Sequence, residues 1–464
     1  MTTAYTFDAR VVRKYDIPGP RYTSYPPAPL FSPEFTEQTL REHIRRSNAD
    51  PIPRRLSLYL HIPYCFSPCF YCGCNRVITR DRSKGRHYVE RLVREIEAVG
   101  SLFDRDREVV QLHMGCGTPN FLRPDELQEI LESVDSHFRI STSDARDFSI
   151  EIDPRFVEPA DIAAYAELGF NRVSLGVQDF DPDVQRAVNR IQSVDETLAV
   201  IDACRLRRFR SINVDLIYGL PMQTLAGFER TLDIVLQARP DRLAIYSYAH
   251  LPELFKAQRQ IDASTLPTPE AKLQLLSLAI DRLSAAGYEY IGMDHFALPE
   301  DPLALAQANG TLHRNFMGYT THANCELVGL GVSAIGYIGD CYSQNARDLP
   351  TWESSLDSGR LPVWRGLELD FDDLLRGELI EQLMCFGRID IPSLEHRYEI
   401  DFHDYFSEEL QRLQPLIEDG LAIADNRSIL ATSRGRLLLR IIAMCFDRYL
   451  HSARSGTPRY SRAI

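Results

Sequence analysis

The sequence predicts an α/β fold built on a parallel sheet, either open or curled into a barrel. Runs rich in β-branched and aromatic residues recur along the chain, and segments with helical apolar spacing separate them. Six strand–helix units in succession are typical of a parallel sheet. The six runs lie at 56–63, 109–117, 148–154, 172–180, 211–219 and 242–250, and a seventh at 288–298 could extend the sheet.

The segments between the runs carry the helical signal. Apolar residues recur at i, i+3, i+4 and i+7 within 87–100 and again within 124–138. This spacing gathers the apolar side chains on one face of each helix, where they can cover a sheet.

The alternation of strands and helices stops after about Trp364. Three helical segments are predicted at 371–387, 402–420 and 435–450, with a hairpin at 421–432 between the last two. A helix–helix–hairpin–helix order resembles a winged-helix module. Because the whole chain is acidic, we interpret this module as a packing or cover domain and not as a DNA reader.

The length of the chain indicates more than one domain. It has 464 residues, and a single core usually stops growing below that size, so two or three domains are expected. The proline-rich stretch 18–29 favours extended backbone and predicts an N-terminal arm lying across the rest of the protein. The predicted boundaries are 1–50 for the arm, 51–362 for an α/β domain and 363–464 for a mainly helical domain.

Composition and charge exclude several classes of protein. The formal net charge of -13 argues against a nucleic-acid binder, which normally shows a basic patch. No apolar run reaches the length of a membrane span, and the N-terminus lacks the apolar core of a signal peptide. We therefore expect a cytoplasmic protein whose ten cysteines are thiols and metal ligands, not disulfides.

Four of the cysteines are concentrated in one short segment after the first predicted strand. Cys65, Cys69 and Cys72 follow the spacing C-x3-C-x2-C, and Cys74 comes two residues later. Thiolates are the usual ligands of iron–sulfur clusters, and a complete set for a [4Fe–4S] cluster is four. Three ligands on one loop predict a cluster with one open iron. A zinc site is disfavoured because neither a second cysteine pair nor suitably spaced histidines accompany the motif.

This motif after the first strand, on a chain of strand–helix units, resembles the radical S-adenosylmethionine (SAM) superfamily. Further motifs along essentially the whole chain resemble one family within it, the oxygen-independent coproporphyrinogen III oxidases. Those motifs are PGPRYTSYP, LYLHIPYC, SIEIDPR, GVQDFDPDVQRAVNR, NVDLIYGLP, IGMDHFA, HRNFMGYTT, GVSAI and the closing YSRAI, together with the extra Cys74.

The resemblance implies a fold and a reaction. The expected fold is a partial (β/α)6 parallel barrel of radical SAM type, with an arm that covers the active site and a winged-helix-like C-terminal domain. The expected cofactors are a [4Fe–4S] cluster held by three cysteines and SAM, with two SAM molecules bound. The expected reaction is the anaerobic oxidative decarboxylation of two propionates of coproporphyrinogen III to vinyl groups, giving protoporphyrinogen IX through a 5′-deoxyadenosyl radical.

The resemblance also implies roles for particular residues. Gln178 and Asp215 stand within otherwise apolar strands, where a polar side chain needs a partner, and this independently favours a binding role. The positions matched to the first SAM are Tyr59, Cys116, Glu151 and Ile335. The positions matched to the second SAM are Tyr71, Gly117, Thr118, Gln178, Arg190, Asp215 and Ala249.

Three residues are candidates for catalysis. Cys74 cannot be a fourth ligand without closing the iron that SAM needs, so we assign it a catalytic or supporting role. His61 is either part of an electron or proton path or a structural histidine. Arg21 in the arm could pair with a substrate propionate, as could His313 and Arg314, because guanidinium and carboxylate groups match in geometry.

The sequence departs from the family pattern at two positions. Cys116 stands where the GGGTP turn has glycine, and Met317 stands where the pattern RNFQGYTT has glutamine. Both departures bear on substrate and SAM handling more than on the fold.

Two other functions remain open at this point. One is a radical SAM enzyme acting on another tetrapyrrole, and the other is a relative that binds or delivers haem. The expected partners are coproporphyrinogen III and a small electron-donor protein or reductase. We expect a monomer without nucleic-acid or membrane partners.

Overall fold

The computed structural model describes residues 7–451 and 460–462, and the chain divides into two compact units. The first, called here the sheet unit, comprises Phe31–Ala286 and Asn324–Glu368. The second, called the helical unit, comprises Met1–Leu30, Gly287–Ala323 and Leu369–Ile464. The predicted domain boundaries at 50 and 362 do not coincide with this division, because the arm is split after Leu30 and residues 287–323 join the C-terminal segment.

The sheet unit contains a parallel core whose strands follow chain order. The order is β9-β8-β7-β6-β4-β1-β14, all parallel, and β15, β16 and β17 continue it antiparallel. The strands of this unit are β1 (Arg55–Ile62), β2 (Tyr64–Cys65), β3 (Val77–Ile78), β4 (Glu108–Cys116), β5 (Arg139–Ile140), β6 (Asp147–Ile152), β7 (Arg172–Gln178), β8 (Ser211–Tyr218), β9 (Arg242–Ser247), β14 (Cys325–Leu330), β15 (Ile335–Ile338), β16 (Cys341–Asn345) and β17 (Val363–Glu368).

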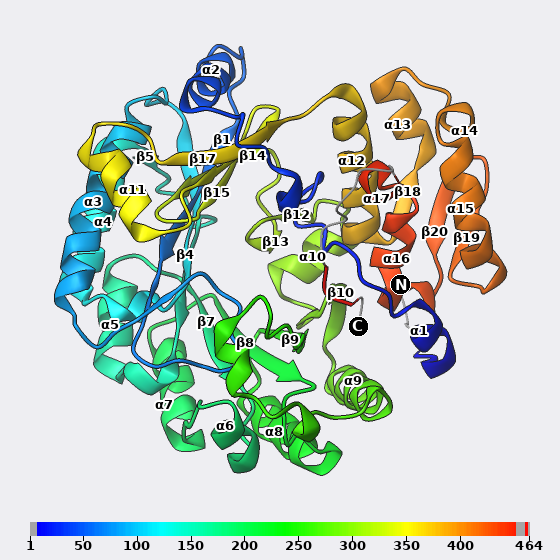
Figure 1. The fold of residues 1–464 in the computed structure, drawn as a ribbon, viewed down its shortest axis with the longest axis horizontal. Helices are drawn as coiled ribbons and strands as arrows, with labels where there is room; N and C mark the ends of the chain where they lie inside the picture. The colour runs from blue at the N-terminus through cyan, green and yellow to red at the C-terminus, as the bar shows by residue number, and fades with distance from the viewer. Residues whose placement is uncertain (1–6, 452–459, 463–464) are drawn as a thin grey trace. The chain divides into compact units, whose positions relative to one another are not determined.

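Helices cover the outer side of this sheet, and α3 to α8 follow its curve in Figure 1. In β1, Leu56, Leu58 and Leu60 are fully buried, and because alternate residues share a face, they form one buried face of the strand. The predicted six-unit parallel α/β core is confirmed. The helices of this unit are α2 (Glu37–Asn48), α3 (Ser83–Gly100), α4 (Pro124–His137), α5 (Pro159–Glu167), α6 (Pro182–Ala187), α7 (Val194–Leu206), α8 (Leu225–Ala238), α9 (Pro269–Ala285) and α11 (Leu349–Asp357).

The helical unit contains the predicted helix–helix–hairpin order and two further hairpins. The seventh predicted run folds here as the antiparallel pair β10 and β11. Its strands are β10 (Glu289–Gly292), β11 (His295–Ala297), β12 (His313–Asn315), β13 (Gly318–Thr320), β18 (Arg388–Asp390), β19 (Ala422–Ala424) and β20 (Ser428–Ala431). Its helices are α1 (Ala9–Tyr15), α10 (Pro302–Ala308), α12 (Phe371–Phe386), α13 (Ile391–Tyr398), α14 (Phe402–Tyr405), α15 (Ser407–Glu418), α16 (Leu439–Met444) and α17 (Arg448–His451).

The predicted helix over 435–450 is divided in the structure. A 3-10 turn, η6 (Gly435–Leu438), precedes α16, and α17 begins after Asp447. The buried Asp447 carboxylate accepts a hydrogen bond from the backbone N–H of Tyr449 at 2.9 Å, which starts the new turn.

Residues 7–30 of the predicted arm pack within the helical unit. The Tyr22 hydroxyl donates to Asp447 at 3.0 Å, and the Arg440 guanidinium donates to the Pro20 carbonyl at 3.0 Å. Pro18 forms an antiparallel bridge with Arg462. Residues 1–6 of the predicted arm and the last two residues of the YSRAI motif lie outside the described residues.

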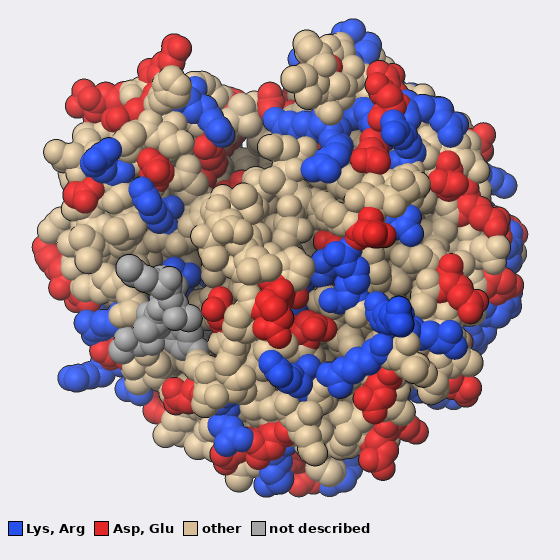
Figure 2. Space-filling model, turned by 180° about the vertical axis from the view of Figure 1, so that it is seen from behind, with Lys and Arg blue, Asp and Glu red and all other residues tan. Residues whose placement is uncertain are grey.

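Surface and helix properties agree with the acidic, mixed composition. Basic and acidic side chains are interspersed over the face shown in Figure 2. Among the residues that the structure describes, no helix combines the length and apolar character that a membrane span requires.

Candidate active site

The loop that carries the cysteines is closed at its base by a short parallel pair of strands. Tyr64 of β2 pairs with Val77 of β3, and the Val77 N–H donates to the Pro63 carbonyl at 2.7 Å. The Thr79 N–H donates to the Cys65 carbonyl at 3.0 Å. These bonds join the two ends of the loop, so the cysteines are held on one compact loop.

Contacts with the end of α6 and with Arg76 fix the interior of this loop. The Phe70 N–H donates to the Val188 carbonyl at 2.9 Å, and the Asn189 side chain donates to the Pro68 carbonyl at 2.7 Å. The Arg76 guanidinium donates to the carbonyls of Cys69, Cys72 and Cys74 at 3.1–3.3 Å. The loop is therefore ordered by hydrogen bonds that do not use the thiols.

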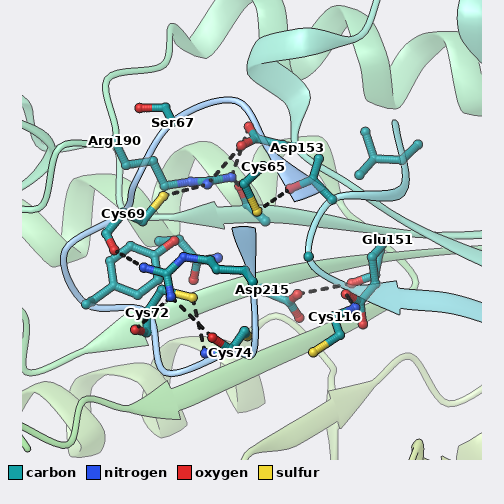
Figure 3. Close-up of a pocket in the computed structure, with 18 residues that line it drawn as sticks. Cys65, Ser67, Cys69, Cys72, Cys74, Cys116, Glu151, Asp153, Arg190 and Asp215 are labelled. Carbon is teal, nitrogen blue, oxygen red and sulfur yellow. Dashed lines mark hydrogen bonds and ion pairs between the residues drawn. The ribbon is translucent and has the colours of Figure 1, made fainter. Parts of the chain in front are cut away.

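The thiols of Cys65, Cys69 and Cys72 face one cavity, as Figure 3 shows. Polar side chains from the carboxyl ends of β4, β6, β7 and β8 line the same cavity, which is the edge where parallel-sheet enzymes place their chemistry. The predicted site residues in the lining are Cys65, Cys69, Tyr71, Cys72, Cys74, Cys116, Gly117, Thr118, Glu151, Gln178, Arg190 and Asp215.

Two guanidiniums and one carboxylate surround the sulfur of Cys69. Arg190 donates to Cys69 Sγ at 3.4 Å and Arg155 donates to it at 3.6 Å. Asp153 accepts from Arg190 at 3.2 Å through both of its oxygens, and from Arg155 at 2.6 and 2.9 Å. The three charged side chains are nearly buried, so the carboxylate between them offsets the repulsion of the two cations.

Glu151 at the end of β6 belongs to a second network. Its carboxylate accepts from the Cys116 N–H at 2.8 Å and from His113 Nε2 at 3.1 Å, while His113 Nδ1 lies 2.5 Å from the Ser149 hydroxyl. Burial opposes ionisation of Glu151, but the hydrogen bond and charge of His113 hold its pKa below the ordinary value. Glu151 therefore faces the cavity as an anion.

Asp215 on β8 is a carboxylate with a different protonation behaviour. It accepts from the Ser174 hydroxyl at 3.1 Å and from the Asn213 amide at 2.8 Å. Burial, followed by the negative charge of Glu151, raises the pKa of Asp215 to about 6. Glu151 and Asp215 therefore differ in charge in mildly acidic solution.

Gln178 carries the clearest sign of a missing ligand. Its Oε1 atom is buried and has no hydrogen-bond donor among the described residues, and its backbone takes a φ of 70°. A buried carbonyl without a donor and a left-handed backbone at a non-glycine residue are both unfavourable, and both are typical of binding sites. Gln178 therefore presents an acceptor to whatever fills the cavity.

Gly117 lets the chain pass close to the loop. A β-carbon at this position would lie 2.2 Å from the Ile62 carbonyl oxygen and 2.7 Å from the Pro63 carbonyl carbon. Both atoms belong to the backbone, which cannot give way easily, so any other residue would displace the turn after β4.

Cys116 has a left-handed backbone conformation, which favours glycine. Its φ is 84°, and its side chain lines the cavity. The thiol therefore lies in the binding space. Contact with the Cys116 thiol is the largest cause that raises the pKa of Cys74. The departure from glycine therefore brings a second thiol beside Cys74.

Five predicted site residues do not line the cavity. Tyr59 stacks on His113 with ring centroids 5.9 Å apart, so it packs against the histidine of the Glu151 network. Ala249 and Tyr71 are linked through Gln258, whose amide donates to both carbonyls. Ile335 lies at the start of β15. The assignments of Tyr59, Ala249 and Ile335 to SAM stay predictions.

His61 and Arg21 occupy other surroundings. His61 is buried, its Nε2 donates to the Asn75 carbonyl at 3.0 Å, and burial lowers its pKa to about 4. These contacts agree with a structural histidine that fixes the end of the cysteine loop, and its catalytic role stays a prediction. Arg21 belongs to the helical unit, where it pairs with Asp294 at 2.6 Å. Met317 lies in the β12–β13 turn of the same unit.

Several residues of the site were not predicted individually. Asp153 and Arg155 lie inside the motif SIEIDPR, and their charges directly after a buried strand were a usable signal. The others carry no local signal that separates them from ordinary strand and loop residues. They are Ser67, Arg76, His113, Ser149, Ser174 and Asn213.

Comparison with known proteins agrees with this geometry. Residues 59–235 match the model of the radical SAM superfamily, and residues 369–438 match the HemN C-terminal domain. The fold and the cysteine loop thus define a radical SAM protein.

Full-length relatives narrow the assignment. The chain is 50% identical over 464 residues, covering all of both chains, to an oxygen-independent coproporphyrinogen III oxidase of Pseudomonas aeruginosa. It is 44% identical to that of Escherichia coli, over 99% of this chain and 98% of the relative. The solved structure of E. coli coproporphyrinogen III oxidase (HemN) matches with a TM-score of 0.91 and 43% identity, over 96% of this chain and all of the other. The chain belongs to the family of oxygen-independent coproporphyrinogen III oxidases.

The cavity fits the cofactors of this family, a [4Fe–4S] cluster and SAM. Its donor set of three cysteine thiols on one loop is the chemistry that an iron–sulfur cluster requires. Among the described residues, no three His, Cys, Asp or Glu side chains close on a single metal-ion position. The unsatisfied Gln178 carbonyl adds an acceptor for SAM.

Replacing Cys116 by glycine tests the departure from the family pattern. Cys116→Gly should raise the free energy of unfolding by about 1–2 kcal/mol, because glycine adopts positive φ without strain. The kcat/KM for SAM should stay unchanged or rise, since the cavity becomes wider. Denaturant unfolding and anaerobic kinetics measure the two effects. A large loss of turnover with the cluster intact would show that the thiol has a function of its own.

Proposed function

We propose that this chain catalyses the oxygen-independent oxidation of coproporphyrinogen III. Two propionate side chains lose CO2 and become vinyl groups, giving protoporphyrinogen IX. The observation that carries the proposal is the joint lining of one cavity by three cluster cysteines and by the charged and polar ends of four parallel strands. Identity to enzymes of this name over the whole chain supports the choice of substrate.

The residues of the chain bind, orient and shield the cofactors. When bound, the cluster and SAM supply a carbon radical that can remove a hydrogen atom from an unactivated side chain. Cys65, Cys69 and Cys72 would hold the cluster, and with three protein ligands it would keep a place for SAM. Glu151, ionised at neutral pH, and the Gln178 carbonyl offer acceptors to the hydroxyl and amino groups of SAM.

Two SAM molecules are part of the proposal. Six of the seven positions matched to the second SAM line the cavity, and the seventh, Ala249, is tied to one of them, Tyr71, through Gln258. Equilibrium dialysis of the reconstituted protein with radiolabelled SAM counts the bound molecules. Binding that saturates at one SAM per chain would limit the site to the first.

The remaining expectations concern the surroundings of the reaction. Each decarboxylation removes one electron beyond the transferred hydrogen atom, and the cluster must be reduced before each turnover, so a donor protein and an electron acceptor are required. We also propose that the arm covers the active site, that the protein is a cytoplasmic monomer, and that it uses neither nucleic acid nor membrane.

Anaerobic incubation with coproporphyrinogen III, SAM and a reductant tests the function. The expected product is protoporphyrinogen IX, measured as protoporphyrin after oxidation, with methionine and 5′-deoxyadenosine formed alongside. SAM cleavage with another tetrapyrrole but not with this substrate would indicate a different radical SAM enzyme. Tight haem binding without substrate oxidation would indicate a haem-delivery relative.

The pKa of Asp215 predicts a pH dependence. An acid whose pKa is raised to about 6 is protonated below that value and ionised above it. If the carboxylate binds SAM, kcat/KM for SAM falls about tenfold per pH unit below about pH 6, since this parameter reports groups of the free enzyme. Asp215→Asn should lower kcat/KM and remove this limb of the profile. An unchanged acidic limb in that variant would assign the titration to another group.

A further inference from the structure

The helical unit contains a group of arginines outside the cysteine cavity. Arg21, Arg314 and the pair of Arg436 and Arg440 come from three separate segments and lie near the turn between β10 and β11. The carboxylate among them is Asp294, in that turn. We call these five residues the arginine cluster.

Two members of the cluster, Arg436 and Arg440, are committed to the fold. Arg440 is buried and donates to backbone carbonyls of residues 19, 20, 461 and 462, so its role is to fasten both ends of the chain. Arg436 is also buried, and its Nη1 reaches the Phe386 carbonyl at 3.5 Å. Both guanidiniums are held by these bonds to backbone carbonyls.

Arg314 is the member with unused donors. It lies on β12 directly opposite Tyr319 on β13, and its guanidinium carbon is 4.6 Å from the centre of the Tyr319 ring. Its Nε and Nη1 atoms are buried and have no hydrogen-bond acceptor among the described residues. The nearby Glu381 carboxylate is used by His313 and by the backbone N–H of Arg314. Buried guanidinium donors without acceptors are unfavourable unless a ligand supplies the acceptors.

The turn between β10 and β11 carries the carboxylate of Asp294. Met293 and Asp294 take φ of 40° and 75°, and Asp294 accepts from Arg21 Nη2 at 2.6 Å. Arg314 lies next to Arg21, because Arg314 Nη2 is 3.5 Å from the backbone carbonyl oxygen of Arg21. The side chains of Arg21 and Asp294 are 36% and 21% exposed, so an anion from solvent can reach them.

His295 follows Asp294 at the start of β11. This imidazole packs edge-on against Tyr319 at 5.6 Å, and its Nδ1 donates to the Met293 carbonyl at 2.7 Å. Burial, followed by the positive charge of Arg314, lowers its pKa to about 4. The histidine stays neutral at neutral pH and adds no further charge.

We propose that the arginine cluster is a carboxylate-binding site, in which Arg314 supplies vacant donors and Arg21 exchanges Asp294 for a carboxylate of the ligand. This inference rests on the proposed function, and it assigns the site to a propionate side chain of the porphyrinogen. Guanidinium groups favour carboxylates because their paired N–H groups match two oxygens. Asp294 then acts as a competing internal anion.

Binding of coproporphyrin III, the stable oxidised form of the substrate, tests the site without turnover. Arg314→Met should raise the Kd for coproporphyrin III about tenfold to a hundredfold, the usual loss of affinity when a hydrogen bond to a charged group is removed. Arg314→Lys should recover part of this affinity. Asp294→Asn should bind several-fold more tightly than the wild type, because Arg21 loses its competitor. The tetramethyl ester of coproporphyrin III should bind weakly and equally to all variants.

Arg388→Met serves as the matched control, because Arg388 lies in the same unit, is 53% exposed and pairs with Asp390 on the surface. It should leave Kd unchanged. Equal affinity of wild type and Arg314→Met, or of acid and ester, would overturn the site. If Arg314→Met does not fold, unchanged affinity in both Arg314→Lys and Asp294→Asn overturns it. Failure of the proposed function shows separately, as absence of protoporphyrin from the wild-type protein in the anaerobic assay.

Discussion

Replacing Cys65, Cys69 or Cys72 by serine should abolish the cluster, whereas Cys74→Ser should retain the iron and lose the product. The first three thiols face the cavity from one loop and supply three of the four corners. An alkoxide is a poor substitute for a thiolate, so each change should reduce bound iron from about four per chain to near zero. Iron analysis and the broad visible absorbance of anaerobically reconstituted protein measure this effect.

Cys74→Ser is the matched control for the number of ligands. Cys74 comes from the same loop and contacts Cys116, but a fourth thiolate would close the iron that SAM needs. Its loss should leave iron content and SAM binding within about twofold of the wild type while product formation falls at least a hundredfold. Loss of iron from Cys74→Ser equal to that from the other three variants would contradict the open-iron site.

The parallel core could be predicted because its signal is local. In β1 the alternate residues Leu56, Leu58, Leu60 and Ile62 are fully buried, and this apolar alternation between a charged start and the cysteine loop is visible in the sequence. The antiparallel strands β15 to β17 were not predicted. They are short and half-exposed, β16 reads CYSQN, and only pairing with distant neighbours makes them strands.

The same distinction applies to the site. The cysteine spacing lies within ten residues and needs no knowledge of the fold. The pair of Asp153 and Arg190 is separated by 37 positions, and its approach to Cys69 depends on where β6 and the segment after α6 lie in space. The single residue Cys116 was recognised as a departure, but its positive φ and its contact with Cys74 required the structure.

Arg190→Met and Arg155→Met form a pair of variants that separates tuning of the cluster from binding of SAM. Both guanidiniums donate to Cys69 Sγ and both share Asp153, but Arg190 lines the cavity and Arg155 is absent from its lining. Hydrogen bonds to cluster sulfurs raise the reduction potential, so each variant should have a lower potential than the wild type.

Only Arg190→Met should weaken SAM binding, by about tenfold to a hundredfold, because it removes a charged donor worth roughly 1.5–3 kcal/mol from the cavity. Arg155→Met should bind SAM within about threefold of the wild type.

In each single variant Asp153 keeps one bidentate cation, whereas the double variant leaves it buried and unpaired. The double variant should therefore lose about 3–5 kcal/mol of folding free energy. Redox titration followed by electron paramagnetic resonance, dialysis with labelled SAM, and denaturant unfolding measure the three effects. Equal SAM affinity in the two single variants would remove Arg190 from the binding site and leave both arginines with a role at the cluster alone.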